Sequence, residues 1–472
     1  MTKIDYKKLE EKLTCVRKNA WEEMSDKEKK DALQFSEGYK IFLNNAKTER
    51  ESVREGIIIA QKMGFKNIAD LKTLKTGDKI YAINRDKNIL FAVIGKNLAQ
   101  DGFNLVMSHI DNPHLDLKVN PLYEDSGLAY FKTHYYGGIK KYQWPTIPLA
   151  LHGVVMLANG KKIEITIGEK EDDPIFMITD LLPHLGKDQL RKTLEEGVTA
   201  EELNVVIGSF PIADKKIKEK IKLAVLELLN KEYGITESDF ISSEINIVAA
   251  SKARDLGFDR SLIAAFGHDD RVCAYTALRA LLDGKNQQRA QLCLWVDREE
   301  IGSEGNTSAQ SVWLENIIAL ILEKTGQPAD FRNVYQIMEK SQAISADVTA
   351  AFDADYKEVH DARNVAYVGC GVALERYTGH RGKSSTSEAS AEYTQKLRSI
   401  FDAQKIIWQT GGLGKVDFGG GGTIAMFLAK RNMDVVDMGV GVLNMHAPME
   451  IVSKADVYQA YRAYKAFLEK IF

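Results

Sequence analysis

Histidines and carboxylates stand at points of the sequence where apolar segments begin or end. The residues of this kind are His109, Asp111, Asp269, Glu299, Glu300, Asp347 and His446. Two neutral imidazoles and three carboxylates can hold two divalent metal ions if one carboxylate bridges the ions. Two ions about 3.5–4 Å apart can hold a reactive water molecule and a substrate oxygen. Each residue alone is more typical of a helix cap or a hydrogen-bonded histidine, but together they predict a hydrolytic centre with two metal ions.

The adjacent glutamates Glu299 and Glu300 suit two different roles in such a centre. Successive side chains at the end of a strand point in different directions, so one glutamate can bind metal while the other faces the water. A carboxylate that stays free of metal can take the proton from that water as general base. Asp111 lies two residues after His109 and shares its face on an extended chain. It could therefore accept the imidazole N–H and orient the ring.

The apolar pattern predicts an α/β fold that brings these segments together. Residues 104–111 are typical of a buried strand, and residues 79–95 of two strands joined near Asp86. Residues 5–24, 25–46 and 450–472 have the spacing of amphipathic helices. In an open α/β sheet, sites form beyond the carboxyl ends of the strands. Segments far apart in the sequence can thus meet at one crevice.

The pattern changes between residues 119 and 251. Short strand-like pieces alternate with prolines there, and a helix rich in lysine and glutamate follows over residues 215–232. The α/β pattern resumes at about residue 252. We therefore predict a discontinuous catalytic domain over residues 1–118 and 252–472, with a β-rich module inserted over residues 119–251.

The composition predicts a globular protein without a strong attraction to nucleic acid or membranes. The chain has 472 residues, of which 44% are hydrophobic and 27% charged, and its formal net charge is −3. The four cysteines lie far apart without a CxxC pair, as in a reduced protein. The charged first residues lack the apolar stretch of a secretory signal, and no apolar run approaches the roughly 20 residues of a membrane span. We expect a cytoplasmic protein without nucleic-acid or membrane partners.

Five motifs, in their order along the chain, resemble those of the M18 family of metalloaminopeptidases. They are SHIDNPHLDLK, GHDDRVCAYTAL, VDREEIGSEGNTSAQS, ISADVTAAFD and NMHAPMEIVSKADV. The resemblance extends from about residue 20 to the C-terminus. It implies the following roles: Asp269 bridges both metals, His109 and Asp347 complete one site, Glu300 and His446 complete the other, Glu299 is the general base and Asp111 orients His109. The mixture of histidine and carboxylate ligands suits zinc, and cobalt or manganese are also compatible.

The family also implies an architecture and an assembly. We expect a mixed-sheet α/β/α dimetal peptidase domain interrupted by a β-rich dimerisation domain, and a homo-dodecamer built from dimers. The segment IPLALHGVV resembles one whose histidine reaches the active site of a neighbouring subunit, and that residue here is His152. Near a substrate carbonyl it could stabilise a developing oxyanion. The alternative is a structural histidine within a strand of the inserted module.

One departure from the family pattern bears on substrate preference. Members that prefer N-terminal Asp or Glu carry a lysine in the region matching Val372–Tyr377, where an ungapped alignment places Glu375. A carboxylate there would repel acidic side chains and favour neutral or basic ones. Arg381 or Lys383 could take the place of that lysine if the alignment shifts.

The residues and the resemblance together predict a metalloaminopeptidase that removes the N-terminal residue of peptides. Related dimetal carboxypeptidases and deacylases are the alternative, and recognition of one end of the substrate separates them from aminopeptidases. A scaffold without activity is disfavoured because every predicted ligand and the base are present.

Overall fold

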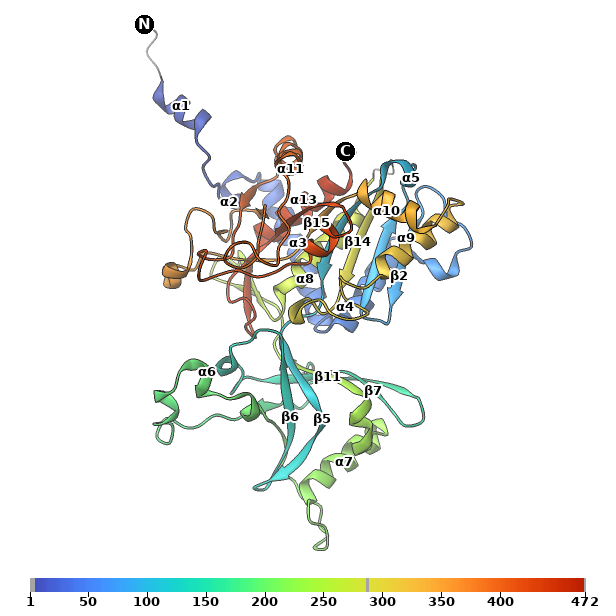
Figure 1. Ribbon diagram of the computed structural model, residues 1–472. Helices are drawn as coiled ribbons and strands as arrows, with labels where there is room; N and C mark the ends of the chain where they lie inside the picture. Colours follow the sequence, from blue (N-terminus) through green and yellow to red (C-terminus); the bar gives the residue numbers. More distant parts are fainter. Residues whose placement is uncertain (1–4, 286–287, 471–472) are drawn as a thin grey trace.

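The computed structural model describes residues 5–285 and 288–470, and the chain forms two lobes, each built on a β-sheet (Figure 1). The larger sheet has nine strands in the order β1-β2-β3-β14-β4-β15-β19-β17-β18. These strands are β1 (Lys66–Asn67), β2 (Lys79–Asn84), β3 (Asn88–Val93), β4 (Phe103–His109), β14 (Ala290–Val296), β15 (Gln342–Ser345), β17 (Val372–Glu375), β18 (Trp408–Thr410) and β19 (Asp434–Gly439).

The centre of the larger sheet is parallel. Strands β14, β4, β15 and β19 run in the same direction, whereas β3 and β17 pair with them in the antiparallel sense. Every residue of β4 and β14 is buried, as expected for strands covered on both faces. The mixed α/β fold predicted from the sequence is confirmed, and the carboxyl ends of β14, β4 and β15 lie at one edge.

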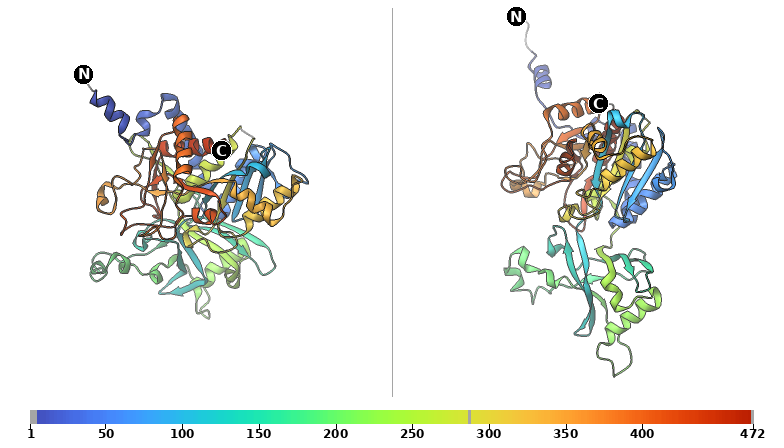
Figure 2. Two further views of the ribbon diagram at one scale, coloured as in Figure 1. Left: turned by 45° about the horizontal axis from the view of Figure 1, so that its top comes forward. Right: turned by 45° about the vertical axis from the view of Figure 1, so that its right-hand side comes forward.

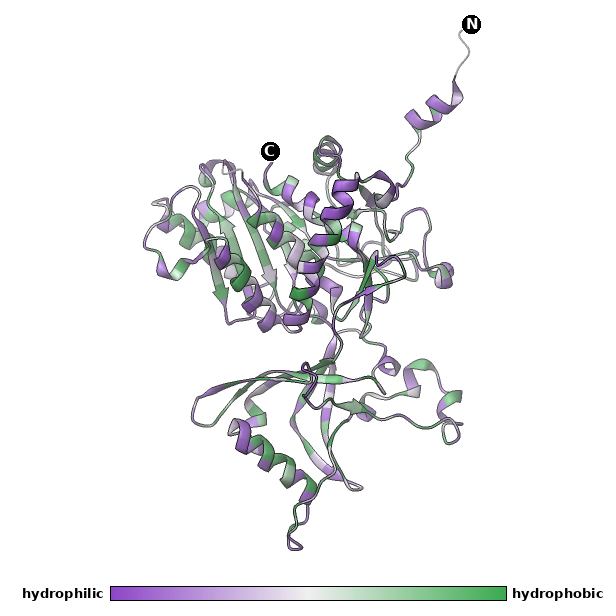
Figure 3. Cartoon of the chain, turned by 180° about the vertical axis from the view of Figure 1, so that it is seen from behind, coloured by the Kyte–Doolittle hydropathy of each residue, from purple (hydrophilic) through white to green (hydrophobic). Residues whose placement is uncertain are grey.

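Helices cover both faces of this sheet (Figures 1 and 2). Side chains of β4 alternate between two apolar cores, with Val106 in one and Leu105 and Met107 in the other. The first core is closed by α3 (Asp26–Asn45), α4 (Glu49–Lys62), α8 (His268–Leu282), α11 (Ala391–Ala403) and α13 (Lys454–Leu468). The second is closed by α9 (Trp313–Lys324), α10 (Phe331–Glu339) and α12 (Ala425–Ala429). Figure 3 shows the apolar residues concentrated along the strands between these layers.

The smaller sheet has seven antiparallel strands in the order β8-β7-β11-β5-β6-β10-β9. Its strands are β5 (His114–Asp125), β6 (Leu128–Tyr136), β7 (Leu149–Met156), β8 (Lys162–Ile167), β9 (Met177–Ile178), β10 (Val205–Gly208) and β11 (Ser243–Ala249). The helices α6 (Leu194–Gly197) and α7 (Lys220–Tyr233) lie in the same lobe. The sheet has its own apolar core, in which Leu115, Phe131 and Ile247 are buried.

Short strands and helices complete the fold. They are β12 (Arg254–Leu256), β13 (Leu262–Ala265), β16 (Thr349–Ala350), β20 (Gly441–Val442), β21 (Glu450–Ser453), α1 (Tyr6–Leu13), α2 (Ala20–Glu23) and α5 (Leu98–Asp101). Across residues 5–285 and 288–470, no helix combines the length and the apolar character needed to cross a membrane.

Three element predictions differ from the structure. The helix predicted over residues 215–232 begins only at Lys220, as α7. The helix predicted over residues 5–24 is broken into α1 and α2, and the side chain of Asn19 caps the start of α2. The helix predicted from residue 450 begins only at Lys454, because residues 450–453 pair with β13 as strand β21. The strand pair predicted over residues 79–95 is present as β2 and β3, with positive φ at Arg85 and Asp86 in the turn.

Candidate metal centre

The ends of three parallel strands bring predicted site residues to one place. His109 is the last residue of β4, Glu299 and Glu300 follow β14, and Asp347 follows β15. Asp269 lies in the first turn of α8, which packs against β4. His446 comes from the turn before β21. The parallel arrangement of the strands explains why residues more than 200 positions apart meet here.

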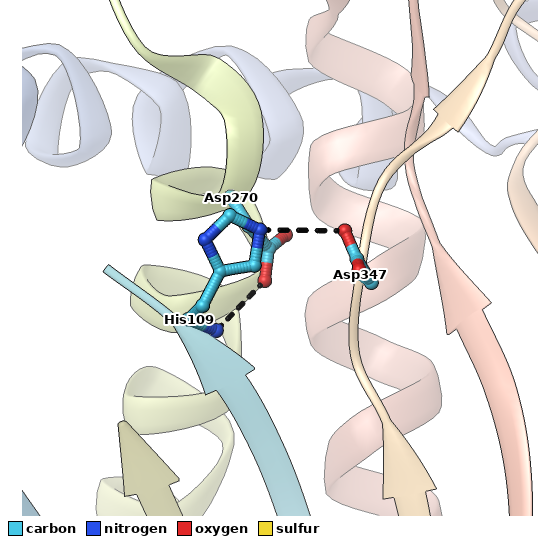
Figure 4. A group of neighbouring side chains, drawn as sticks. All are labelled: His109, Asp270 and Asp347. Atoms are coloured by element: carbon cyan, nitrogen blue, oxygen red, sulfur yellow. Dashed lines mark hydrogen bonds and ion pairs between the residues drawn. The ribbon is translucent and has the colours of Figure 1, made fainter. Parts of the chain in front are cut away.

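Asp269 stands between the two histidines. His109 Nε2 lies 3.3 Å from Asp269 Oδ1 and 3.6 Å from Asp347 Oδ1. His446 Nε2 lies 3.2 Å from Asp269 Oδ2 and 3.4 Å from Glu300 Oε2. Each carboxylate oxygen of Asp269 thus faces a different histidine, and the Nε2 atom of each histidine faces one further carboxylate. Figure 4 shows His109 and Asp347 pointing toward one another, with Asp270 beside them.

The donor atoms at this centre suit divalent metal ions. His109, Asp269 and Glu300 can each offer one ligand atom within 4.8 Å of the others, as can His109, Asp270 and Asp347. Glu300 Oε1 is buried and has no hydrogen-bond partner among the residues that the structure describes. Burial and the neighbouring Asp269 carboxylate raise the pKa of Glu300, and burial also raises the pKa of Asp347. Added positive charge would relieve this crowding, and imidazole with carboxylate is a ligand set that zinc accepts.

Asp111 connects His109 with the two glutamates. The carbonyl oxygen of Asp111 lies 3.0 Å from His109 Nδ1 and can only accept a hydrogen bond, so Nδ1 carries the proton. Nε2 then faces the Asp269 and Asp347 carboxylates, where it could bind a metal ion. The Asp111 side chain accepts the backbone N–H groups of Glu299 (3.1 Å) and Glu300 (3.2 Å). The carboxylate therefore fixes the turn that carries both glutamates.

In the absence of metal, the surroundings of Glu299 favour its neutral, protonated carboxyl group. Burial, followed by the Asp347 carboxylate, raises the pKa of Glu299 to about 8. Such a shift is typical of a carboxyl group that exchanges protons during a reaction.

Sequence reasoning missed three residues that hold the centre. Glu450 accepts the backbone N–H groups of Asp269 (3.0 Å) and His446 (2.7 Å). Asp270 accepts the backbone N–H of His109 at 3.3 Å. Tyr136 donates its hydroxyl to the Asp111 carboxylate at 2.9 Å. Glu450 stands between the apolar residues Met449 and Ile451, and Asp270 follows the predicted ligand Asp269. These positions are the signals that the sequence offers.

The remaining predicted residues lie outside this centre. His152 is on β7 and only 2% exposed, with its ring nitrogens 2.9 Å from Glu51 and 3.1 Å from Glu169. A role of His152 in a neighbouring subunit would require it to break both contacts, and that role stays a prediction.

The three specificity candidates are also placed by the structure. Glu375 ends β17, is 6% exposed and accepts the hydroxyl of Thr349. Arg381 is exposed, and Lys383 in the same loop pairs with Glu388 at 3.0 Å. Neither cation is brought to the centre, whereas Glu375 is close enough for the Asp347 carboxylate to contribute to its raised pKa.

Known proteins with similar sequences and structures agree on one family. Residues 42–468 match the family described as aminopeptidase I zinc metalloprotease (M18). A Clostridium acetobutylicum protein named "Probable M18 family aminopeptidase 1" is 47% identical over 455 residues, covering 96% of this chain and 98% of that protein. The crystal structure of an M18-family aminopeptidase from Thermotoga maritima is 46% identical and has a TM-score of 0.93, covering 97% of this chain and 100% of that one. The resemblance seen in the motifs is confirmed: this chain belongs to the M18 family of zinc metalloproteases and is an aminopeptidase.

Proposed function

We propose that this aminopeptidase removes the N-terminal residue of peptides with two metal ions and a glutamate base. The observation that carries the proposal is the position of Asp269, whose two oxygens face His109 and His446 at 3.3 and 3.2 Å. A carboxylate so placed can bridge two ions. His109 and Asp347 would hold the first ion, and Glu300 and His446 the second. Zinc is the metal named in the family description, and cobalt or manganese would suit the same ligands.

Glu299 is the proposed general base. When bound, two divalent ions would polarise the substrate carbonyl, lower the pKa of water and, by their charge, lower the pKa of Glu299. Glu299 accepts the proton of the attacking water and afterwards donates it to the amine that leaves. Asp111 keeps Glu299 in place by accepting its backbone N–H at 3.1 Å. A single residue, Glu299, thus serves in both proton transfers.

Replacing Glu299 by glutamine tests this assignment. The amide cannot accept the proton, so kcat should fall about 10²–10⁴-fold while both metal ions stay bound. Turnover of aminoacyl chromogenic substrates and metal content by mass spectrometry give the two readouts. Exposed Glu227 on α7 offers a matched control, because Glu227→Gln makes the same change far from the centre. Near-normal turnover in a metal-loaded Glu299→Gln protein would contradict the role.

We also infer the domain plan and the assembly. Residues 1–118 and 252–472 would form the catalytic domain, and residues 119–251 a dimerisation domain within a homo-dodecamer built from dimers. A Saccharomyces chain of the same fold, 20% identical with a TM-score of 0.73, is described as a dodecamer. Light scattering at micromolar concentration should give a mass several times that of the 52.8 kDa chain, and a value near 53 kDa would refute the assembly. The four cysteines are free thiols, which supports a cytoplasmic location.

A further inference from the structure

The last residue of β6 and the two residues that follow it reach from the smaller sheet into the metal centre. Tyr136 donates its hydroxyl to Asp111 Oδ2 at 2.9 Å. At Gly137, an added Cβ would lie 3.3 Å from the Cβ of Glu300. The carbonyl oxygen of Gly138 lies 2.8 Å from His446 Nδ1. One short segment therefore contacts residues on both halves of the centre.

We propose that residues 136–138 are a positioning segment, which sets the geometry of both metal sites and makes metal affinity and turnover depend on the smaller sheet. The proposal rests on the dimetal function proposed above. None of the three residues is a ligand or touches the reacting atoms. They act through Asp111, Glu300 and His446.

The tyrosine acts on the first half of the centre through Asp111. This carboxylate is 2% exposed, its Oδ1 lies 3.4 Å from His109 Nδ1, and it accepts the backbone N–H groups of Glu299 and Glu300. Its Oδ2 atom receives two donors, the Tyr136 hydroxyl and the backbone N–H of Glu300. A buried acceptor that loses a donor is free to turn toward another partner. Without the hydroxyl, Asp111 would hold its neighbours less firmly, and partners of metal ligands typically affect affinity or activity about 10–100-fold.

The smaller sheet holds the tyrosine in place. The Tyr136 ring stacks on His114, its partner across β5 and β6, with centroids 4.5 Å apart and an interplanar angle of 15°. His114 Nε2 lies 3.0 Å from Asp116 Oδ1, which also accepts from Asn246 on β11 at 3.0 Å. Three strands of the smaller sheet thus fix the ring whose hydroxyl reaches Asp111.

The glycines act on the second half of the centre. The side chain of His446 is 33% exposed, so packing alone does not fix its ring. The Gly138 carbonyl can only accept, and it therefore places the proton on Nδ1 and directs Nε2 toward Asp269 and Glu300. Gly137 has φ of +71°, a conformation that side chains with a Cβ rarely adopt. Alanine at Gly137 would strain the segment and press on Glu300.

Two variants with matched controls test the positioning segment. Tyr136→Phe removes only the hydroxyl, and Tyr135→Phe makes the same change on the next side chain, which is 41% exposed. Gly137→Ala strains the end of β6. Gly127→Ala imposes a similar strain at the other end of the hairpin, because Gly127 has φ of +82° and nothing within 4 Å of an added Cβ. Cobalt and zinc dissociation constants come from competition with a chelator, and kcat and KM from aminoacyl chromogenic substrates.

We expect Tyr136→Phe and Gly137→Ala each to weaken metal binding or lower kcat about 10–100-fold with little change in KM. Both controls should match the wild type, and melting temperatures identify any variant that loses its fold. If Tyr136→Phe and Gly137→Ala bind metal and turn over like their controls, the inference is wrong while the dimetal function stands. If the wild type itself binds fewer than two ions per chain, the dimetal function fails instead.

Discussion

Glu375 is expected to make the metal-free protein less stable as the pH rises. It lies opposite Asp437 on the paired strands β17 and β19 and accepts the hydroxyl of Thr349. Burial, with the Asp437 carboxylate as the largest charge effect, raises the pKa of Glu375 from its ordinary 4.5 to about 8. Glu375 is thus mostly neutral at pH 7, which weakens the repulsion of acidic substrates argued from the sequence.

The sign and size of the pH effect follow from this shift. Between pH 4.5 and 8 the folded chain keeps the Glu375 proton while the unfolded chain has lost it. The folded state then binds more protons, so the free energy of unfolding falls as the pH rises through this window. At about 1.4 kcal/mol per pH unit, the loss between pH 5.5 and pH 8.5 is about 3 kcal/mol from this residue.

Replacing Glu375 by glutamine isolates this contribution, because the amide keeps the shape of the neutral acid and cannot ionise. Urea unfolding in EDTA at pH 5.5 and pH 8.5 measures the loss of stability in both proteins. The loss should be about 3 kcal/mol smaller in Glu375→Gln than in the wild type. Glu227→Gln on exposed α7 is the control and should behave like the wild type. An equal loss in Glu375→Gln and the wild type would refute the reasoning.

Two further predictions concern the ligands and the substrate. Asp269→Asn should weaken both metal sites together, whereas His109→Ala and His446→Ala should each weaken mainly one site. Metal titration measures these affinities, and two ions still tightly bound in Asp269→Asn would argue against a bridging carboxylate. Above about pH 8, where Glu375 is ionised, neutral or basic N-terminal residues should be cleaved better than Asp or Glu, and Glu375→Lys should move the preference toward acidic ones. A wild-type preference for Asp and Glu in a panel of aminoacyl substrates at that pH would overturn this idea.

Residues that end apolar strands could be predicted from the sequence. His109 and Asp347 follow short apolar runs, and the parallel order of β4 and β15 makes their ends neighbours. The family motifs then pointed to the same residues. The mixed α/β fold followed from the same apolar pattern.

Contacts that depend on turns and distant pairing could not be predicted in this way. His446 has φ of +66° and is held by Gly138, which lies 308 positions earlier, just after β6. Residues 450–453 form a strand because β13 offers them a partner nearly 190 positions earlier, although their local pattern continues the helix. The neutral state of Glu375 depends on burial, which a sequence position does not reveal.

Metal titration of the apoenzyme shows whether hydrolysis requires two metal ions per chain. Protein freed of metal with a chelator is titrated with zinc, and hydrolysis of an aminoacyl chromogenic substrate is followed at each addition. Activity should be absent without metal and should reach its maximum at two ions per chain. Full activity in the metal-free protein, or a maximum at a single ion with no second ion bound, would contradict this requirement.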